Sequence, residues 1–295
     1  MKLLAPSYYK AFICIADKCK HSCCIGWEID IDKNTVCKYS ALSGEYAEKI
    51  KSSITGKSVP HFKLCKNGKC PHLDGRGLCQ IITEYGESYL CDICREHPRF
   101  YIDTPKGKEV GLGMSCEEAA RIILSSDGYA DFVKIGEIEG TPDMCDFDAI
   151  EQRKWIFSTL AGDLTYQQKL DAISSRYGVF LSVHSDTEWR EILYELEYLD
   201  NAHADLFSGF QSNPQTEKTL EAFLIRAFAY FVFRHCSEAK NESKFAASLG
   251  FATFCTSLLA SISNTENVFE NARIISEELE YSEDNTEYLK MEFLF

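Results

Sequence analysis

The chain has 295 residues and a formal net charge of −14 at pH 7, so it can bury a sizeable core but lacks the basic excess of a nucleic-acid-binding protein. Residues 1 to 9 contain one lysine and no sustained apolar segment, so we expect no secretory signal there. We therefore expect a cytoplasmic protein whose 14 cysteines are reduced, because disulfide scaffolds are short and secreted.

Cysteine usage and charge both change along the chain. Eleven of the 14 cysteines lie in residues 1 to 116, which carry 17 basic and 13 acidic side chains, whereas residues 117 to 295 carry 14 and 32. The sequence therefore predicts a mainly α fold in two parts. Residues 1 to 125 would form a cysteine-rich, metal-binding domain with the short strands, and residues 126 to 295 an acidic, all-α helical domain.

A dense group of thiols lies near the start of the chain. Three cysteines fall within six residues: Cys19, Cys23 and Cys24. Thiols packed this closely in a reducing compartment favour a soft metal ion or an iron–sulfur cluster. Next along the chain, Asp32 can cap a helix over residues 33 to 54 that is broken near Gly44.

The later cysteines of this part lie in a turn and a helix. Residues 70 to 79 carry a cysteine at each end and contain Asp-Gly and a second glycine, which predicts a tight turn that brings the two sulfurs together. Residues 83 to 97 are helical in pattern, with Cys91 and Cys94 on one face. Residues 104 to 107 suit a hairpin turn.

A clear helix start follows at Ser115. This serine lies three residues before Glu118, which predicts a capping box, and Cys116 would then lie in the first helical turn. The N-terminal end of a helix favours a thiolate or an anionic cluster, because unpaired backbone N–H groups and the helix dipole stabilise negative charge there.

The second part shows helical periodicity. Residues 189 to 199 and 268 to 279 form amphipathic stripes, and residues 220 to 233 read as a central apolar helix. Residues 245 to 262 carry no charge, yet we expect no membrane span there, because the segment contains serines and threonines and lacks flanking basic anchors. This segment is predicted to pack against the central helix. The apolar tail at residues 293 to 295 is predicted to dock on the rest of the chain.

Spacing alone leaves zinc and iron open. A structural zinc site usually takes four ligands from two CxxC-like pairs, but the sequence holds a single CxxC, Cys91 to Cys94. An iron–sulfur cluster takes four thiolates from any part of the fold, and adjacent cysteines such as Cys23 and Cys24 suit it better than one tetrahedral zinc. We favour a [4Fe–4S] cluster and keep zinc as the alternative.

Several enzyme signatures are missing. A radical adenosylmethionine enzyme would need a third cysteine where this chain has Gly26, within a repeating strand–helix pattern that is not seen. Gly111 and Gly113 fall short of a dinucleotide or adenosyl fingerprint, and the sequence has no phosphate-binding P-loop.

The order and spacing of several short motifs match a known family. They are Pro6-x-Tyr8-Tyr9, Cys19-x3-Cys23-Cys24-x-Gly26-Trp27-x-Ile29-x-Ile31-Asp32, Cys70-Pro71-x-Leu73 with Gly77-Leu78-Cys79, Gly86-Glu87-x2-Leu90-x3-Cys94-Arg95-x2-Pro98-Arg99 and Ser115-Cys116-x-Glu118-Ala119-Ala120-Arg121. In these motifs residues 1 to about 125 resemble the flagellin lysine-N-methylase family, FliB. The same region is similar to a broader group of cysteine-cluster proteins described as zinc or iron chelators.

The resemblance implies an S-adenosylmethionine-dependent protein-lysine N-methyltransferase whose substrate is flagellin and whose cysteines hold an iron–sulfur cluster. Carried over position by position, it names seven metal-ligand candidates: Cys19, Cys23, Cys24, Cys70, Cys79, Cys94 and Cys116. The family motif does not specify the residue at the position of Cys91, so the resemblance gives Cys91 no role. Seven candidates exceed the four ligands of one cluster, and the resemblance places neither the adenosylmethionine site nor a catalytic base.

Two function classes follow from this sequence: a protein-lysine methyltransferase, or a cysteine-cluster metal-binding protein without catalysis. For the first class, the acidic second part is expected to recruit a lysine-bearing partner electrostatically. The acidic segment that contains Glu277, Glu278 and Glu280 is the surface we expect to attract it.

Overall fold

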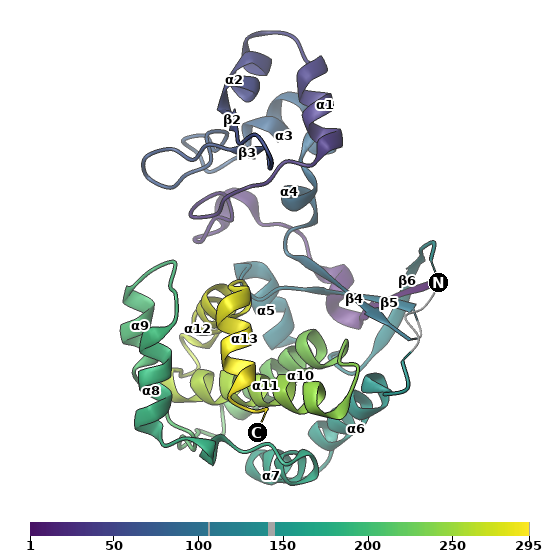
Figure 1. The fold of residues 1–295 in the computed structure, drawn as a ribbon, viewed down its shortest axis with the longest axis vertical. Coiled ribbons are helices and arrows are strands. Elements are labelled where there is room, and N and C mark those ends of the chain that lie inside the picture. The colour runs from purple at the N-terminus through teal and green to yellow at the C-terminus, as the bar shows by residue number, and fades with distance from the viewer. Residues whose placement is uncertain (106, 141–144, 295) are drawn as a thin grey trace. The chain divides into compact units, whose positions relative to one another are not determined.

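The computed structural model describes residues 1 to 105, 107 to 140 and 145 to 294, and the chain divides into two compact units (Figure 1). The cysteine unit is Ile13–Arg99, and the helical unit combines Met1–Phe12 with Phe100–Phe295. These bounds differ from the division at residue 125 that cysteine usage suggests. The difference arises because the N-terminal strand and residues 100 to 125 pack with the later helices.

The cysteine unit consists of short elements. They are the 3-10 helix η2 (Ala16–Lys18), α1 (Lys33–Ala41), α2 (Glu45–Ser53), β2 (Ile54–Thr55), β3 (His61–Phe62), α3 (Gln80–Tyr85), the 3-10 helix η3 (Glu87–Tyr89) and α4 (Asp92–Glu96). The predicted break near Gly44 is confirmed, and Asp32 caps α1 by accepting a hydrogen bond from the backbone N of Thr35 at 2.9 Å. The single helix expected over residues 83 to 97 is wrong, because η3 and Leu90 interrupt it.

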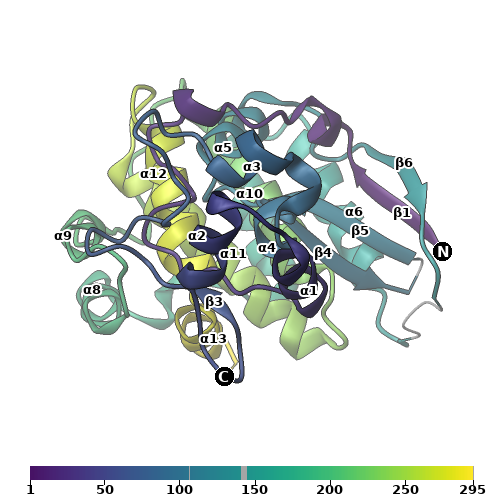
Figure 2. The same cartoon turned by 90° about the horizontal axis from the view of Figure 1, so that it is seen from above.

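The helical unit contains a four-stranded sheet of order β4-β5-β1-β6 (Figure 2). Its strands are β1 (Lys2–Pro6), β4 (Arg99–Thr104), β5 (Gly107–Leu112) and β6 (Phe132–Glu137). β1 runs parallel to β5 and antiparallel to β6, with Leu3 opposite Lys108 on one side and Gly136 on the other. β4 and β5 are neighbours, as the predicted hairpin requires, although its turn includes residue 106, which lies outside the described residues.

The mainly α fold is confirmed, and two details of the predicted fold class are corrected. β6 lies within residues 126 to 295, so that part is not all-α, and strands are not confined to the first 125 residues. β6 pairs with an edge of β1 that the strand order would otherwise leave open. The four-stranded sheet also belongs to the helical unit and not to the cysteine unit.

Helices make up the rest of the helical unit. They are the 3-10 helix η1 (Ser7–Ala11), α5 (Glu117–Ser125), α6 (Ala149–Ala161), α7 (Tyr166–Tyr177), the 3-10 helix η4 (Leu181–Val183), α8 (Asp186–Glu195), α9 (Ala202–Phe207), α10 (Glu221–Cys236), α11 (Glu242–Ile262), α12 (Val268–Ile275), the π-helix η5 (Ser276–Glu280) and α13 (Glu283–Met291). As predicted, α10 and α11 are central and pack on each other.

The core of the helical unit lies between α10, the sheet and α11. Phe233 of α10 contacts Phe100 of β4 and Phe132 of β6, with ring centroids 5.4 and 5.1 Å apart. Gly111 of β5 faces the rings of Phe100 and Phe233, and a Cβ there would lie 2.3 Å from Phe100. The C-terminal tail docks as expected at Phe293, whose ring stacks on Trp189 at 5.6 Å.

α11 is long and apolar enough by length and composition to cross a membrane, with a mean hydropathy of 1.7 in its most apolar window. Of that window, 78% is buried inside the protein. Core helices of globular proteins share this character, and the absence of a membrane span stays a prediction.

The predicted capping box at Ser115 is wrong. α5 begins after Cys116, which is its N-cap residue, and no side chain caps that end. The hydroxyl of Ser115 is buried without a hydrogen-bond partner among the described residues, and Glu118 instead pairs with Arg121 one helical turn later.

A buried ion pair joins the sheet to the helices. Arg153 of α6 donates two hydrogen bonds to Glu109 of β5, at 2.6 and 2.8 Å, and a third to Ser237 at 2.6 Å. Both charged side chains are almost completely buried. Each charge therefore offsets the free-energy cost of burying the other.

We predict that Arg153→Met alone destabilises the protein by about 3–5 kcal/mol, because it leaves the Glu109 carboxylate buried and unpaired. Arg153→Met combined with Glu109→Gln should recover most of that loss. Arg121→Ala, which removes an exposed pair with Glu118, should change stability by about 1 kcal/mol or less. Equilibrium unfolding in urea measures the free energy of unfolding of all three variants. An equal loss of stability in Arg153→Met and in the double variant would contradict the view that the two buried charges compensate each other.

Candidate metal centre

Backbone pairing brings the first two thiols of the centre together. The backbone N of Cys70 donates to the carbonyl of Cys24 at 2.8 Å, and that of Gly26 donates to the carbonyl of Gly68 at 2.9 Å. Gly26 and Gly68 have φ angles of +84° and +73°, a region that glycine enters without a steric penalty. The two segments can therefore turn sharply while Cys24 and Cys70 stay adjacent.

The turn from Cys70 to Cys79 adds a third thiol, as the sequence predicts. The backbone N of Gln80 donates to the carbonyl of His72 at 2.8 Å, which closes the turn. Inside it, the Asp74 carboxylate accepts from the backbone N of Leu78 at 2.9 Å and of Arg76 at 2.8 Å. These hydrogen bonds, the one from Leu78 first, lower the pKa of Asp74.

Cys91 and Cys94 complete the group from α4. Cys91 is the N-cap residue of this helix, and the backbone N of Arg95 donates to its carbonyl at 2.9 Å. Asp32, which also caps α1, accepts a hydrogen bond from the backbone N of Asp92 at 3.0 Å. One carboxylate therefore fixes the starts of both helices, and with them the position of the Cys91–Cys94 pair.

These residues form the five-thiol group: Cys24, Cys70, Cys79, Cys91 and Cys94. Two of them, Cys70 and Cys91, are buried in the apolar core of the cysteine unit, and the other three are partly buried and pack against that core. None of these five described residues forms a disulfide. A compact set of reduced, shielded sulfurs is the donor set that zinc and iron–sulfur clusters use.

The thiols lie within electrostatic reach of one another, which affects their pKa values. Burial first, and then negative charge on Cys24, Cys79 or Cys91, raises the pKa of Cys70 to about 12. The pKa of Cys94 is raised most by its hydrogen bond to Cys91, which in turn lowers the pKa of Cys91. Thiols that disfavour one another's ionisation fit a bound cation, which would offset the repulsion.

His72 lies among the thiols but has both ring nitrogens engaged. Its Nδ1 is 2.9 Å from the hydroxyl of Tyr46, and its Nε2 is 2.9 Å from the hydroxyl of Ser53. Burial, followed by the charge of Lys49, lowers its pKa to about 4, so the ring is neutral at pH 7. His72 is therefore a structural residue of this core, and the ligand candidates here are sulfurs.

The spacing of the sulfurs bears on the choice between zinc and iron. Zn–S bonds of about 2.3 Å place tetrahedral ligands about 3.8 Å apart. Among the residues described, the groups of three donor atoms within 4.8 Å of one another are Glu28, Asp30 and His61, and His203, Glu277 and Glu278, and they include none of the five thiols. A preformed zinc site of this spacing is therefore not seen at the thiols of the described residues, and both zinc and an iron–sulfur cluster stay predictions.

The structure gathers four of the seven predicted ligands: Cys24, Cys70, Cys79 and Cys94. Cys23 neighbours the group through a hydrogen bond to the Cys24 thiol, which lowers the pKa of Cys24 to about 7. Cys19 donates to the carbonyl of His21 at 3.1 Å. Cys116 belongs to the helical unit. Metal binding by all seven stays a prediction.

Cys91 joins the group although the family resemblance gives it no role. The signal in the sequence is its CxxC spacing with Cys94, which places both thiols at the start of one helix. Of the remaining cysteines, Cys14, Cys37 and Cys65 are exposed, while Cys236 and Cys255 are buried in the helical unit.

Comparison with known proteins finds similarity over part of the chain. A stretch of 133 residues, 42% of this chain, is 29% identical to proteins named lysine-N-methylase from Salmonella typhimurium and Salmonella choleraesuis. It is also 29% identical to a Salmonella muenchen protein named flagellar biosynthetic protein FliU. The match spans 33% of the length of the two methylases and 79% of that of FliU. No family model and no solved structure matches the chain.

We predict that Cys70→Ser lowers the metal content of the purified protein to less than half. The reason is that Cys70 belongs to the five-thiol group and is buried in the core of the cysteine unit. Cys65→Ser is the matched control, because Cys65 is an exposed thiol in the same unit and outside the group. Iron and zinc are measured by mass spectrometry after anaerobic purification. Full metal retention in Cys70→Ser would contradict the site.

Proposed function

We propose that this chain is a FliB-type protein-lysine N-methyltransferase, which transfers methyl groups from S-adenosylmethionine to lysine side chains of flagellin. The observation that carries the proposal is the sequence match to proteins named lysine-N-methylase, taken together with a shielded five-thiol group in the cysteine unit. The name FliU of a third relative supports a flagellar substrate. The chain spans only about a third of the methylases' length, so their activity is extended to it as a proposal.

The cysteine unit would hold a [4Fe–4S] cluster, with four ligands drawn from Cys24, Cys70, Cys79, Cys91 and Cys94. The single CxxC pair in the sequence and the adjacent Cys23 and Cys24 support iron–sulfur over zinc. Adenosylmethionine supplies an electrophilic methyl group. The acceptor lysine must be a neutral amine to take it, because an ammonium group has no lone pair.

Electrostatic recruitment of a lysine-bearing partner remains part of the proposal, but its residues need correction. Glu278 and Glu280 are buried and hydrogen-bonded inside the helical unit, and Glu277 pairs with Arg273 at 2.8 Å. These three glutamates therefore form no open attracting surface. The helical unit still carries 34 acidic and 18 basic side chains, and exposed acids such as Glu191 and Glu195 of α8 can provide the field.

We expect purified flagellin to gain methyl groups on lysine when incubated with this protein and adenosylmethionine under anaerobic conditions. Peptide mass spectrometry locates the modified lysines. Flagellin whose surface lysines have been acetylated is the control, since an acetylated amine cannot accept a methyl group. Absence of methyl-lysine with a metal-loaded protein would refute the proposed function and favour a metal-binding protein without catalysis.

We predict that the apparent KM for flagellin rises with salt, because screening shortens the reach of surface charge to about 8 Å at physiological ionic strength. Glu191→Lys with Glu195→Lys should raise KM at low salt and flatten its salt dependence. The control is Lys57→Gln, which changes an exposed charge in the cysteine unit. If the KM of the unmodified protein does not vary with salt, electrostatic recruitment of flagellin is refuted.

A further inference from the structure

Among its described residues, the helical unit contains three histidine–glutamate pairs that differ in exposure. In His235–Glu280 both side chains are buried, and in His184–Glu292 both are partly exposed. His203–Glu278 alone combines a buried carboxylate, 1% exposed, with an imidazole that is 16% exposed. A buried carboxylate that holds a solvent-accessible imidazole is the arrangement found in general-base dyads.

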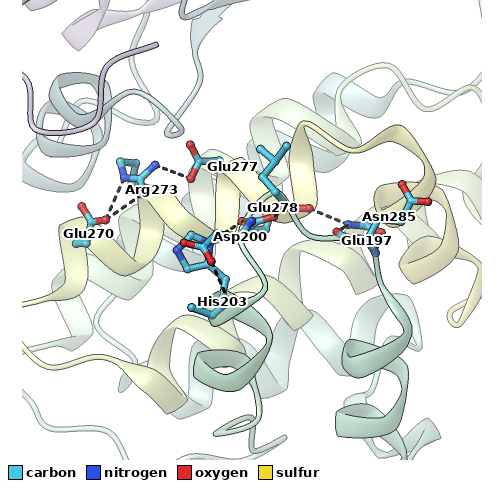
Figure 3. A network of polar contacts seen from close by, with 10 residues as sticks. Glu197, Asp200, His203, Glu270, Arg273, Glu277, Glu278 and Asn285 are labelled. Carbon is cyan, nitrogen blue, oxygen red and sulfur yellow. Dashed lines mark hydrogen bonds and ion pairs between the residues drawn. The ribbon is translucent and has the colours of Figure 1, made fainter. Parts of the chain in front are cut away.

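The Glu278 carboxylate is held rigidly and orients the imidazole (Figure 3). Its Oε1 accepts from Nδ1 of His203 at 2.5 Å and from the backbone N of Asp200 at 3.2 Å, and its Oε2 accepts from the backbone N of Leu199 at 2.7 Å. Glu278 lies in the π-helix η5, a kind of distortion that often marks functional sites. These contacts assign the proton to Nδ1, so Nε2 carries the lone pair.

The Nε2 atom is available for a substrate. Within the described part of the chain, His203 has no hydrogen bond other than the one at Nδ1. By contrast, the ring of His235, which Glu280 binds through Nε2 at 2.6 Å, is buried together with its carboxylate. Among these three pairs of described residues, His203–Glu278 therefore combines a partly exposed ring with a fully buried carboxylate.

The charges around His203 favour a cation. Asp200 and Glu277 face the imidazole with Glu278, and each raises its affinity for a proton. The guanidinium of Arg273 in α12 is shared between Glu270 and Glu277. Tyr198, whose pKa is raised by burial and then by Glu278, is the other titratable group at this place. Negative charge exceeds positive charge, which suits an ammonium group.

An apolar surface lies beside this charge. Leu199, whose backbone N binds Glu278, has 57% of its surface exposed. Lysine side chains commonly lay their methylene stems along such apolar groups while the charged end reaches polar partners.

We propose that His203 is the general base that removes a proton from the acceptor lysine, and that Glu278 is the positioning residue that orients it. This inference rests on the proposed methyltransferase function. The lysine N–H bond breaks, its electron pair stays on nitrogen, and the proton moves to Nε2 of His203. The neutral amine then bonds to the methyl carbon of adenosylmethionine, and the electron pair of the broken carbon–sulfur bond stays on the departing thioether.

A base is needed because only on the order of one lysine side chain in a thousand is neutral near pH 7. The hydrogen bond to Glu278, and then the negative charges of Glu278, Asp200 and Glu277, raise the pKa of His203 above its usual value near 6.5, while burial opposes them. A raised pKa narrows the gap to lysine and makes proton transfer easier. The neutral imidazole is the active form, so activity should rise with pH through this raised pKa.

The test compares His203→Ala with the unmodified protein in flagellin methylation, with His184→Ala as the matched control. His184 also pairs with a glutamate, at 2.6 Å, but is not part of the dyad. We expect His203→Ala to lower kcat about 10²-fold or more, with KM changed only a few-fold, and added imidazole to restore part of the rate. The ascending limb of the pH profile should vanish in His203→Ala and persist in His184→Ala.

A second variant addresses the positioning residue. Glu278→Gln removes the negative charge that raises the pKa of His203, so the ascending limb should move to lower pH and kcat should fall. Histidine NMR titration of the same variant, which requires no catalysis, should show a lower pKa for His203 than in the unmodified protein. Thermal unfolding of each variant separates these effects from loss of the fold.

The outcomes separate the inference from the function it rests on. If the unmodified protein methylates lysine and His203→Ala keeps its rate and pH profile, the inference is wrong and the function stands. If the unmodified protein methylates no lysine, the proposed function and the inference about His203 are both refuted. Loss of a stoichiometric divalent metal from His203→Ala would also overturn the inference, because His203, Glu277 and Glu278 would then be metal ligands.

Discussion

The convergence of five thiols in the cysteine unit is the constraint on which this account depends. The buried apolar residues of that unit are few, among them Ile29, Ile31, Tyr39, Ile50 and Phe62, and its helices are short. Small units of this kind usually need a further stabilising element, such as disulfide bonds or a structural metal, beyond their apolar core. If the thiols hold a metal cluster, the free energy of metal binding becomes free energy of folding, and the turns at Gly26, Gly68 and Asp74 serve to bring the ligands into place.

Sequence patterns predicted the local features that rest on short-range chemistry. The cap at Asp32, the break at Gly44 and the Cys70 to Cys79 turn follow from residue types next to one another, and all three are present. The partner strand of β1 depends on long-range packing, which periodicity does not encode. Cys91 was signalled only by its CxxC spacing with Cys94, because the family motifs give it no role. The capping box at Ser115 failed because Glu118 finds a better partner in Arg121.

The candidate base shows the same limit. His203 and Glu278 are 75 residues apart in sequence, and no spacing rule connects them. From the sequence, Glu278 is one acid in a solvated acidic segment, and burial in a π-helix is what changes its role. Charge counts therefore described the helical unit correctly as acidic, but they could not separate the acids that act at a distance from those that act through one buried hydrogen bond.

The central claim, that the thiols hold an iron–sulfur cluster, is tested most directly by X-ray absorption at the iron and zinc edges of the anaerobically purified protein. The account predicts iron surrounded by sulfur, with a second shell of iron neighbours and acid-labile sulfide in equal amount to iron. A single zinc ion in a four-sulfur shell without sulfide, or iron bound to oxygen and nitrogen, would contradict it.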